Sequence, residues 1–156
     1  NLGTEPHLKL ETFAELRKLQ KLSLAGNNFS SIPFGLLSFK KNLVYLDLSS
    51  NNLHISEFSL SSLTALLYLN QLDISFNSYD EYFPYTIVRS IPSLKELGIA
   101  GTELNCHCLG LLIKNLSRNK IFVMEPKSSV KNESNIEGIF CTKNDENCKF
   151  NSFTLI

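Results

Sequence analysis

The chain has 156 residues, and 43% of them are apolar, which is enough for one continuous hydrophobic core. Lysine and arginine together number 15, as do aspartate and glutamate, and the formal net charge of +0 gives no support for nucleic-acid or anionic-membrane binding. No run of about eighteen apolar residues occurs, so we expect no membrane span within this chain.

Residues 1–18 contain neither a cysteine nor an amphipathic cap. They match the later part of the repeating unit that follows them, with Asn1 in the place of its asparagine and Leu10, Phe13 and Leu16 as apolar residues of its outer side. We therefore expect a partial first coil, in a fragment of a longer protein whose earlier repeats would cover the first full coil.

A leucine pattern then recurs four times, at intervals of about 25 residues. Its spacing is L-x-x-L-x-L-x-x-N-x-L, and the chain resembles the leucine-rich repeat family over residues 1–105. The four repeats start near residues 19, 43, 69 and 94. The matching residues are Leu19, Leu22, Leu24, Asn27 and Phe29, then Leu43, Leu46, Leu48, Asn51 and Leu53, then Leu69, Leu72, Ile74, Asn77 and Tyr79, and finally Leu94, Leu97, Ile99, Thr102 and Leu104.

In this family each repeat is one coil of a solenoid, so the resemblance implies an α/β fold with a curved parallel sheet on the concave face. The leucines of each strand would point into a core that no single coil closes alone. We expect Asn27, Asn51 and Asn77 to be buried, because an asparagine amide both donates and accepts and can pair with backbone groups of adjacent coils. Thr102 departs from this pattern in the last coil.

Two of the ladder asparagines are followed directly by a second asparagine. Asn28 opens an N-x-S/T sequence, which marks an acceptor of N-linked sugar in a secreted protein, whereas Asn52 does not. Two further sequences of this kind start at Asn132 and at Asn115, which helical spacing places off a core-facing side. These three positions are the candidate glycosylation sites.

The strand residues between the core leucines are expected to point outward on the concave surface and to bind the ligand. Stacked coils would place Tyr45 beside Gln71 and Asp47 beside Asp73. Two adjacent carboxylates repel each other, and either a cationic group of a partner relieves this cost or both stay solvated. Tyr45 is the best anchor, because it combines a rigid apolar body with a hydrogen-bonding tip. The candidate ligand-binding residues are Lys21, Tyr45, Asp47, Gln71, Asp73 and Glu96.

A second candidate surface is the aromatic stretch SYDEYFPY, residues 78–85. Tyr82, Phe83 and Tyr85 exceed the aromatic side chains that one coil usually needs, and aromatic residues are favoured in interface cores. The alternative, which we favour for this stretch, is that they fill the convex side of the solenoid.

All four cysteines follow the last repeat, as Cys106, Cys108, Cys141 and Cys148. Thiolates together with His107 could ligate zinc, but structural zinc sites more often have gaps of about two to four residues between paired cysteines. An even number of cysteines at the end of a solenoid instead indicates a disulfide-stapled lid in an oxidising compartment. The residues alone allow three connectivities.

The stretch LNCHCLGLLIKNL resembles the opening of the cysteine-rich C-terminal cap of extracellular leucine-rich repeat proteins, as in Toll-like receptors, variable lymphocyte receptors and Slit proteins. The resemblance implies that residues 106–156 form the cap, with Cys106 paired to Cys141 and Cys108 paired to Cys148. Helical spacing predicts a short helix whose core-facing side consists of Leu109, Leu112, Ile113 and Leu116.

The sequence contains no recognisable enzymatic motif. It has no glycine-rich phosphate loop, and His7, His54 and His107 lack a serine or cysteine nucleophile placed by a recognisable motif. We expect His54 to be an exposed turn residue. The sequence predicts a binding module without a metal or cofactor, and not an enzyme.

Two function classes remain. The Toll-like resemblance implies part of an innate immune pattern-recognition receptor, at the cell surface or in endosomes, that binds a protein or glycan-bearing ligand and pairs as a homodimer or with a co-receptor. The alternative is an extracellular adhesion or matrix protein with a structural or guidance role. A transmembrane helix followed by a signalling domain in the longer gene would favour the first class.

Overall fold

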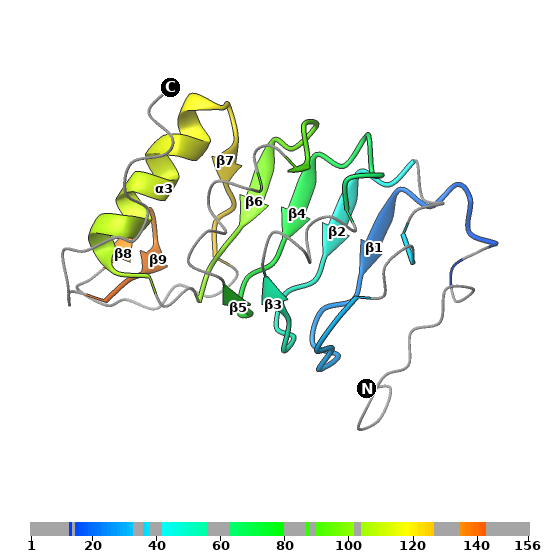
Figure 1. The fold of residues 1–156 in the computed structure, drawn as a ribbon, viewed down its shortest axis with the longest axis horizontal. Coiled ribbons are helices and arrows are strands. Elements are labelled where there is room, and N and C mark those ends of the chain that lie inside the picture. The colour runs from blue at the N-terminus through cyan, green and yellow to red at the C-terminus, as the bar shows by residue number, and fades with distance from the viewer. Residues whose placement is uncertain are drawn as a thin grey trace.

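The computed structural model describes residues 13, 15–32, 36–37, 42–55, 63–79, 87, 90–101, 104–126 and 135–142. Its main feature is a five-stranded parallel sheet, shown in Figure 1, in which each strand pairs with the strand of the next coil. The predicted α/β solenoid with a parallel sheet is confirmed. In spatial order the strands are β1 (Lys21–Ser23), β2 (Tyr45–Asp47), β4 (Gln71–Asp73), β6 (Glu96–Gly98) and β7 (Phe122–Val123).

Equivalent positions of successive repeats lie side by side in this sheet. Tyr45 pairs with Gln71 and Asp47 pairs with Asp73, as predicted. The strand β7 is an addition to the prediction: it follows the cap helix and pairs with β6, so that Phe122 lies beside Glu96. The sheet therefore continues beyond the four repeats into the cap.

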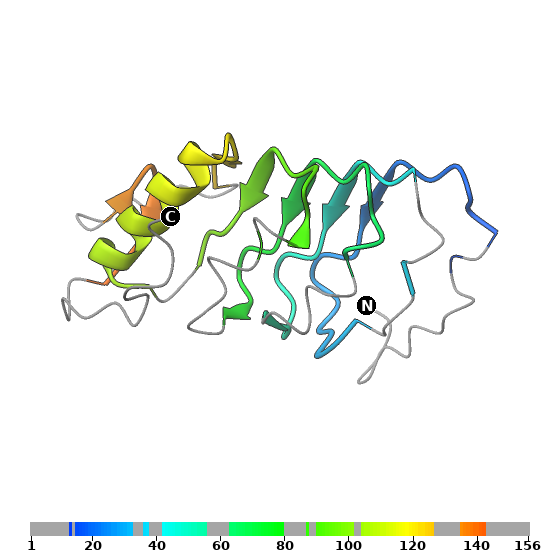
Figure 2. The same cartoon turned by 45° about the horizontal axis from the view of Figure 1, so that its top comes forward.

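A second, two-stranded parallel sheet consists of β3 (His54–Ile55) and β5 (Ser78–Tyr79). Figure 2 shows it on the opposite side of the solenoid from the main sheet. His54 is exposed, as expected, but it lies in β3 with its Nδ1 3.2 Å from Ser78 Oγ. The predicted turn at His54 is wrong, because adjacent coils also pair on this convex side.

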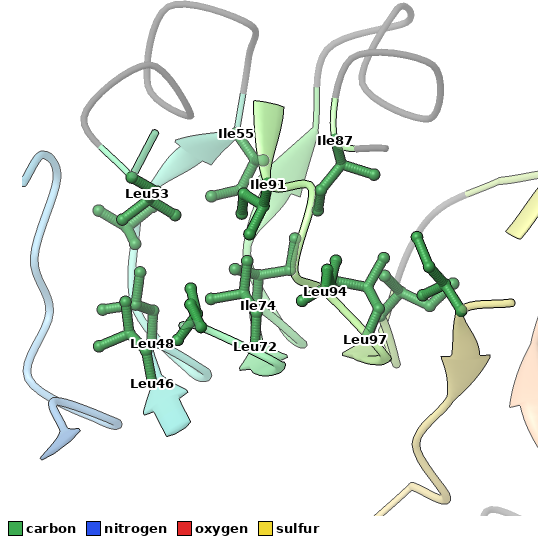
Figure 3. Close-up of a cluster of buried hydrophobic side chains, with 14 of the residues drawn as sticks. Leu46, Leu48, Leu53, Ile55, Leu72, Ile74, Ile87, Ile91, Leu94 and Leu97 are labelled. Carbon is green, nitrogen blue, oxygen red and sulfur yellow. The ribbon is translucent and has the colours of Figure 1, made fainter. Parts of the chain in front are cut away.

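The core lies between the two sheets, where leucines and isoleucines of successive coils stack in rows (Figure 3). Leu46, Leu72 and Leu97 are the central residues of β2, β4 and β6, and all three are fully buried. Each coil shares its core with its neighbours, so no coil buries its apolar side chains alone.

The first coil is less well covered. Leu16 is 50% exposed, although Leu66, its counterpart two repeats later, is buried. Leu16, expected as an apolar residue of the outer side, is thus half exposed, and no described coil packs against it from the N-terminal side. Phe13 packs against the core as expected, whereas Asn1 and Leu10 lie outside the described residues.

The ladder asparagines connect neighbouring coils through their side-chain amides. Asn51 Oδ1 accepts hydrogen bonds from the backbone N–H groups of Asn27 at 3.1 Å and Phe29 at 3.0 Å, both in the preceding coil. Asn51 Nδ2 donates to the carbonyl oxygens of Leu24 in that coil and Leu48 in its own coil, both at 2.9 Å. One side chain thus satisfies backbone groups of two coils.

Asn77 repeats this arrangement one coil further on. It accepts from the Leu53 N–H at 3.0 Å and donates to the Leu48 carbonyl at 3.0 Å. Asn77 is buried as expected, but Asn27 and Asn51, nearer the open end of the described solenoid, are only half-buried. Thr102 lies outside the described residues.

The cap helix, α3 (Cys106–Arg118), covers the end of the core next to β7. Asn105 caps its N-terminus, since its side-chain oxygen accepts a hydrogen bond from the Cys108 N–H at 2.8 Å. The predicted core-facing side is confirmed, with Leu109, Leu112 and Leu116 buried and Ile113 partly buried.

The predicted disulfide between Cys106 and Cys141 is confirmed. Two backbone hydrogen bonds lie beside it, from the Cys106 N–H to the Thr142 carbonyl at 2.9 Å and from the Thr142 N–H to the Leu104 carbonyl at 3.1 Å. An antiparallel hairpin, β8 (Asn135–Ile136) and β9 (Ile139–Phe140), precedes Cys141.

The second predicted disulfide is described only at one end. Cys108 is disulfide-bonded, while Cys148 lies outside the described residues. The pairing of Cys108 with Cys148 therefore stays a prediction.

We expect Asn51→Ala to lower the free energy of unfolding by about 1–3 kcal/mol, because it leaves backbone groups of two coils without a partner. Asn52→Ala, at the exposed neighbouring position, should change it by less than about 0.5 kcal/mol. Chemical denaturation of both variants measures this difference, and equal losses would show that Asn51 is not a ladder residue.

Candidate functional site

The first residues of the five strands form a line of side chains across the main sheet. We call this line the concave row. Its members lie side by side because the strands are paired in register. Lys21 and Phe122 at its two ends are exposed, and the three residues between them are half-buried. Gln71 Nε2 donates a hydrogen bond to Glu96 Oε2 at 2.9 Å. The concave row consists of Lys21, Tyr45, Gln71, Glu96 and Phe122.

Phe122 is the member of this row that the leucine pattern does not reveal. It lies in a two-residue strand that follows α3 and lacks the L-x-x-L-x-L spacing. In the sequence, the short apolar run Ile121, Phe122 and Val123, made of β-branched and aromatic residues, is consistent with a strand at this point.

The next row of the sheet contains Ser23, Asp47, Asp73 and Gly98, and its two carboxylates are buried. Asp47 is 5% exposed and Asp73 is 4% exposed. Both predicted alternatives, a solvated pair and a pair facing a cationic partner, are therefore corrected. The reason is that these side chains are covered within the sheet and receive hydrogen bonds from donors of this chain.

The donors to Asp47 come from its own coil and from β1. Asp47 Oδ1 accepts from the Ser49 N–H at 3.0 Å and from Ser49 Oγ at 2.6 Å. Asp47 Oδ2 accepts from Tyr45 Oη at 3.3 Å and from Ser23 Oγ at 3.4 Å. The aspartate thus holds the Tyr45 hydroxyl, and we interpret it as support for the concave row.

Asp73 repeats the same local motif, because its Oδ1 accepts from the Ser75 N–H at 3.0 Å. On its other side lies Gly98, which pairs with Asp73 across β4 and β6. A Cβ atom at residue 98 would lie 2.3 Å from Asp73 Oδ1, which is far inside van der Waals contact. The missing side chain at Gly98 makes room for the buried carboxylate.

Tyr79 lies on the core side of the same region. Its hydroxyl donates a hydrogen bond to the Ile74 carbonyl. Burial raises the pKa of the Tyr79 phenol above its usual range, and the negative charge of Asp73 raises it further. Tyr79 is therefore a neutral structural residue at neutral pH.

The candidate glycosylation sites differ in accessibility. Asn28 is exposed, just beyond the end of β1. Asn115 is half-buried in α3, and its Oδ1 accepts a hydrogen bond from Asn119 Nδ2 at 3.0 Å, so it is less free than the helical spacing suggested. Asn132 lies outside the described residues, as do Tyr82, Phe83 and Tyr85 of the aromatic stretch.

The described residues contain no cluster of three or more His, Cys, Asp or Glu side chains that could hold a metal ion. In the same part of the chain, no helix combines the length and the apolar character that crossing a membrane requires.

Comparison with known proteins gives a family model, a relative and solved structures of similar fold. Residues 18–39 and 42–66 match the model of the Leucine Rich Repeat family. Toll-like receptor 10 of Bos taurus is 32% identical to this chain over 98 residues, which are 62% of this chain and 11% of the receptor. The chain therefore spans about a tenth of that receptor's length.

Among solved structures, internalin C2 from Listeria monocytogenes has a similar fold. The two superpose with a TM-score of 0.54 at 19% sequence identity, over 88% of this chain and 57% of the internalin. At this level of identity, the likeness concerns the fold alone.

We expect Gly98→Ala to lower the free energy of unfolding by about 1–3 kcal/mol, because the added methyl group collides with the Asp73 carboxylate. Gly110→Ala is the matched control: in α3, its Cβ would lie 3.5 Å from Ile136 Cδ1, an ordinary contact. This second variant should gain roughly 0.5–1 kcal/mol from helix propensity. Thermal or chemical unfolding measures the stability of both variants. If both were more stable than the parent chain, the close packing of Asp73 against Gly98 would be contradicted.

Proposed function

Because the chain is a leucine-rich repeat protein that resembles a region of a Toll-like receptor ectodomain, we propose that it is an extracellular recognition module. It binds a protein or glycan-bearing partner on its concave face, as part of an innate immune receptor that works as a homodimer or with a co-receptor. The observation that carries this proposal is the concave row, in which each of five coupled strands presents one accessible side chain.

The chemistry of the concave row suits an extended macromolecule better than a small molecule. The row offers a cation at Lys21, a carboxylate at Glu96 and aromatic side chains at Tyr45 and Phe122. Tyr45 is the proposed central anchor, since Asp47 fixes its hydroxyl and less side-chain freedom remains to be lost on binding. Asp47 and Asp73 act beneath the row and would not contact the partner.

The proposed extracellular location rests on the cap and on one sugar site. A disulfide such as Cys106–Cys141 persists in oxidising compartments and is rare in the cytosol. Asn28 is exposed and begins an N-x-S sequence beyond the end of β1, so a glycan there would leave the concave row open.

Partners for the test would come from a display library of extracellular proteins and from a glycan array, each screened with the secreted 156-residue chain. We expect Tyr45→Ala and Phe122→Ala to weaken binding of a confirmed partner by more than about 1 kcal/mol. Phe140→Ala is the matched control, because Phe140 is an exposed aromatic residue of β9 outside the concave row.

Biolayer interferometry would measure these affinities, and melting curves would show that the variants stay folded. If binding persists in both row variants and is lost in Phe140→Ala, recognition lies at β9 and the concave-face proposal is wrong.

A further inference from the structure

An open hollow of about 650 Å³ lies at the edge of the main sheet where β4, β6 and β7 begin. We call it the edge pocket. Figure 1 shows these three strands next to one another, and the pocket is lined by residues of the turns that precede them. Leu67 and Tyr68 come from the turn before β4, Lys95 directly precedes β6, and Lys120 and Phe122 come from the end of α3 and from β7.

The walls of the edge pocket carry the most exposed large apolar side chains of the described residues. Leu67 is 65% exposed, Tyr68 62% and Phe122 68%, and these are the three most exposed large apolar side chains of the described residues. Leu67 stands between the buried Leu66 and Leu69, so the turn directs this one leucine away from the core. Clustered exposed apolar residues with two aromatic rings are typical of a protein-binding surface.

The charge of the edge pocket selects the kind of partner. Lys95 and Lys120 line it and are exposed to solvent. The acidic residue among its lining is Glu96, whose carboxylate already accepts the hydrogen bond from Gln71. Two exposed ammonium groups beside an apolar floor complement a partner that carries carboxylates next to a large apolar side chain.

We propose that the edge pocket anchors an apolar side chain of an acidic, extended segment of a protein partner. This inference deepens the proposed recognition function and rests on it, because Glu96 and Phe122 belong both to the concave row and to the pocket wall. A segment lying along the concave row would reach the pocket without leaving the surface. The leucine and aromatic side chains would enclose its apolar residue, while the lysines pair with the flanking carboxylates.

A second copy of this chain fits the pocket less well. In a twofold contact the same patch faces itself, so the lysines of one copy, Lys95 and Lys120, would approach those of the other. Such like-charge contacts oppose association, whereas an acidic partner removes the repulsion. The occupant is therefore a different protein segment.

Three labelled peptides test this inference with the 156-residue chain: DELFED, the equally charged DEAAED, and the charge-reversed KKLFKK. We expect fluorescence anisotropy to show that DELFED binds at least tenfold more tightly than either of the others. Leu67→Ala should lower the affinity for DELFED at least fivefold. Lys120→Glu should lower the affinity for DELFED but raise the affinity for KKLFKK. Leu111→Ala, which removes an exposed leucine of α3 outside the pocket, should leave binding unchanged.

Lys120→Glu separates this inference from the concave-face proposal, because Lys120 lines the pocket but does not belong to the concave row. Its opposite effects on the binding of DELFED and of KKLFKK report on the pocket, whatever the role of the concave row. The inference is overturned if DELFED fails to bind at about 1 mM, if DEAAED binds equally well, or if Leu67→Ala has no effect. Sedimentation that reveals a dimer dissolved by Phe122→Ala would also overturn it, since the occupant would then be a second copy.

Discussion

The hydrogen bonds of the ladder asparagines are the constraint on which the rest of the structure depends. A coil that turns away from its strand leaves backbone N–H and C=O groups that cannot find partners within the same coil. Asn51 provides these partners for two coils at once. Its side chain accepts hydrogen bonds from the N–H groups of Asn27 and Phe29 and donates to the carbonyl oxygens of Leu24 and Leu48. The coils are thus held at one spacing, and their leucines stack into one core.

Fixed spacing between coils has a direct effect on the exposed face. Because the strands cannot slip past one another, each position of the repeat becomes a continuous line of side chains across the sheet. One line has exposed or half-buried members, and the line beside it contains the buried, hydrogen-bonded carboxylates of Asp47 and Asp73. Asp47 shows how the two cooperate: it is covered by neighbouring strands, yet it holds the hydroxyl of Tyr45 in the accessible line.

Sequence spacing predicted the features that depend on one repeat and its copies. The leucine period indicated β1, β2, β4 and β6, and the resemblance of the cap implied the Cys106–Cys141 bond that the structure contains. Burial of Asp47 and Asp73 was missed because alternation along a strand shows which side a residue faces, but not how closely neighbouring strands cover it. The edge pocket was missed because three turns, about 25 residues apart, build it together.

The boundary between the repeats and the cap near residue 105 is a prediction. The strand β7 lies beyond this boundary but pairs with β6 of the last repeat. A cap that only covered the end of the core could be exchanged between related proteins without changing the accessible surface of the repeats. Here the cap adds Phe122 to the same line as Glu96, so the accessible surface crosses from the repeats into the cap. Under the proposed recognition function, grafting another cap onto these repeats would transfer part of the partner preference as well as closing the solenoid. Chimaeras designed at this junction would therefore need to keep β7 with the repeats.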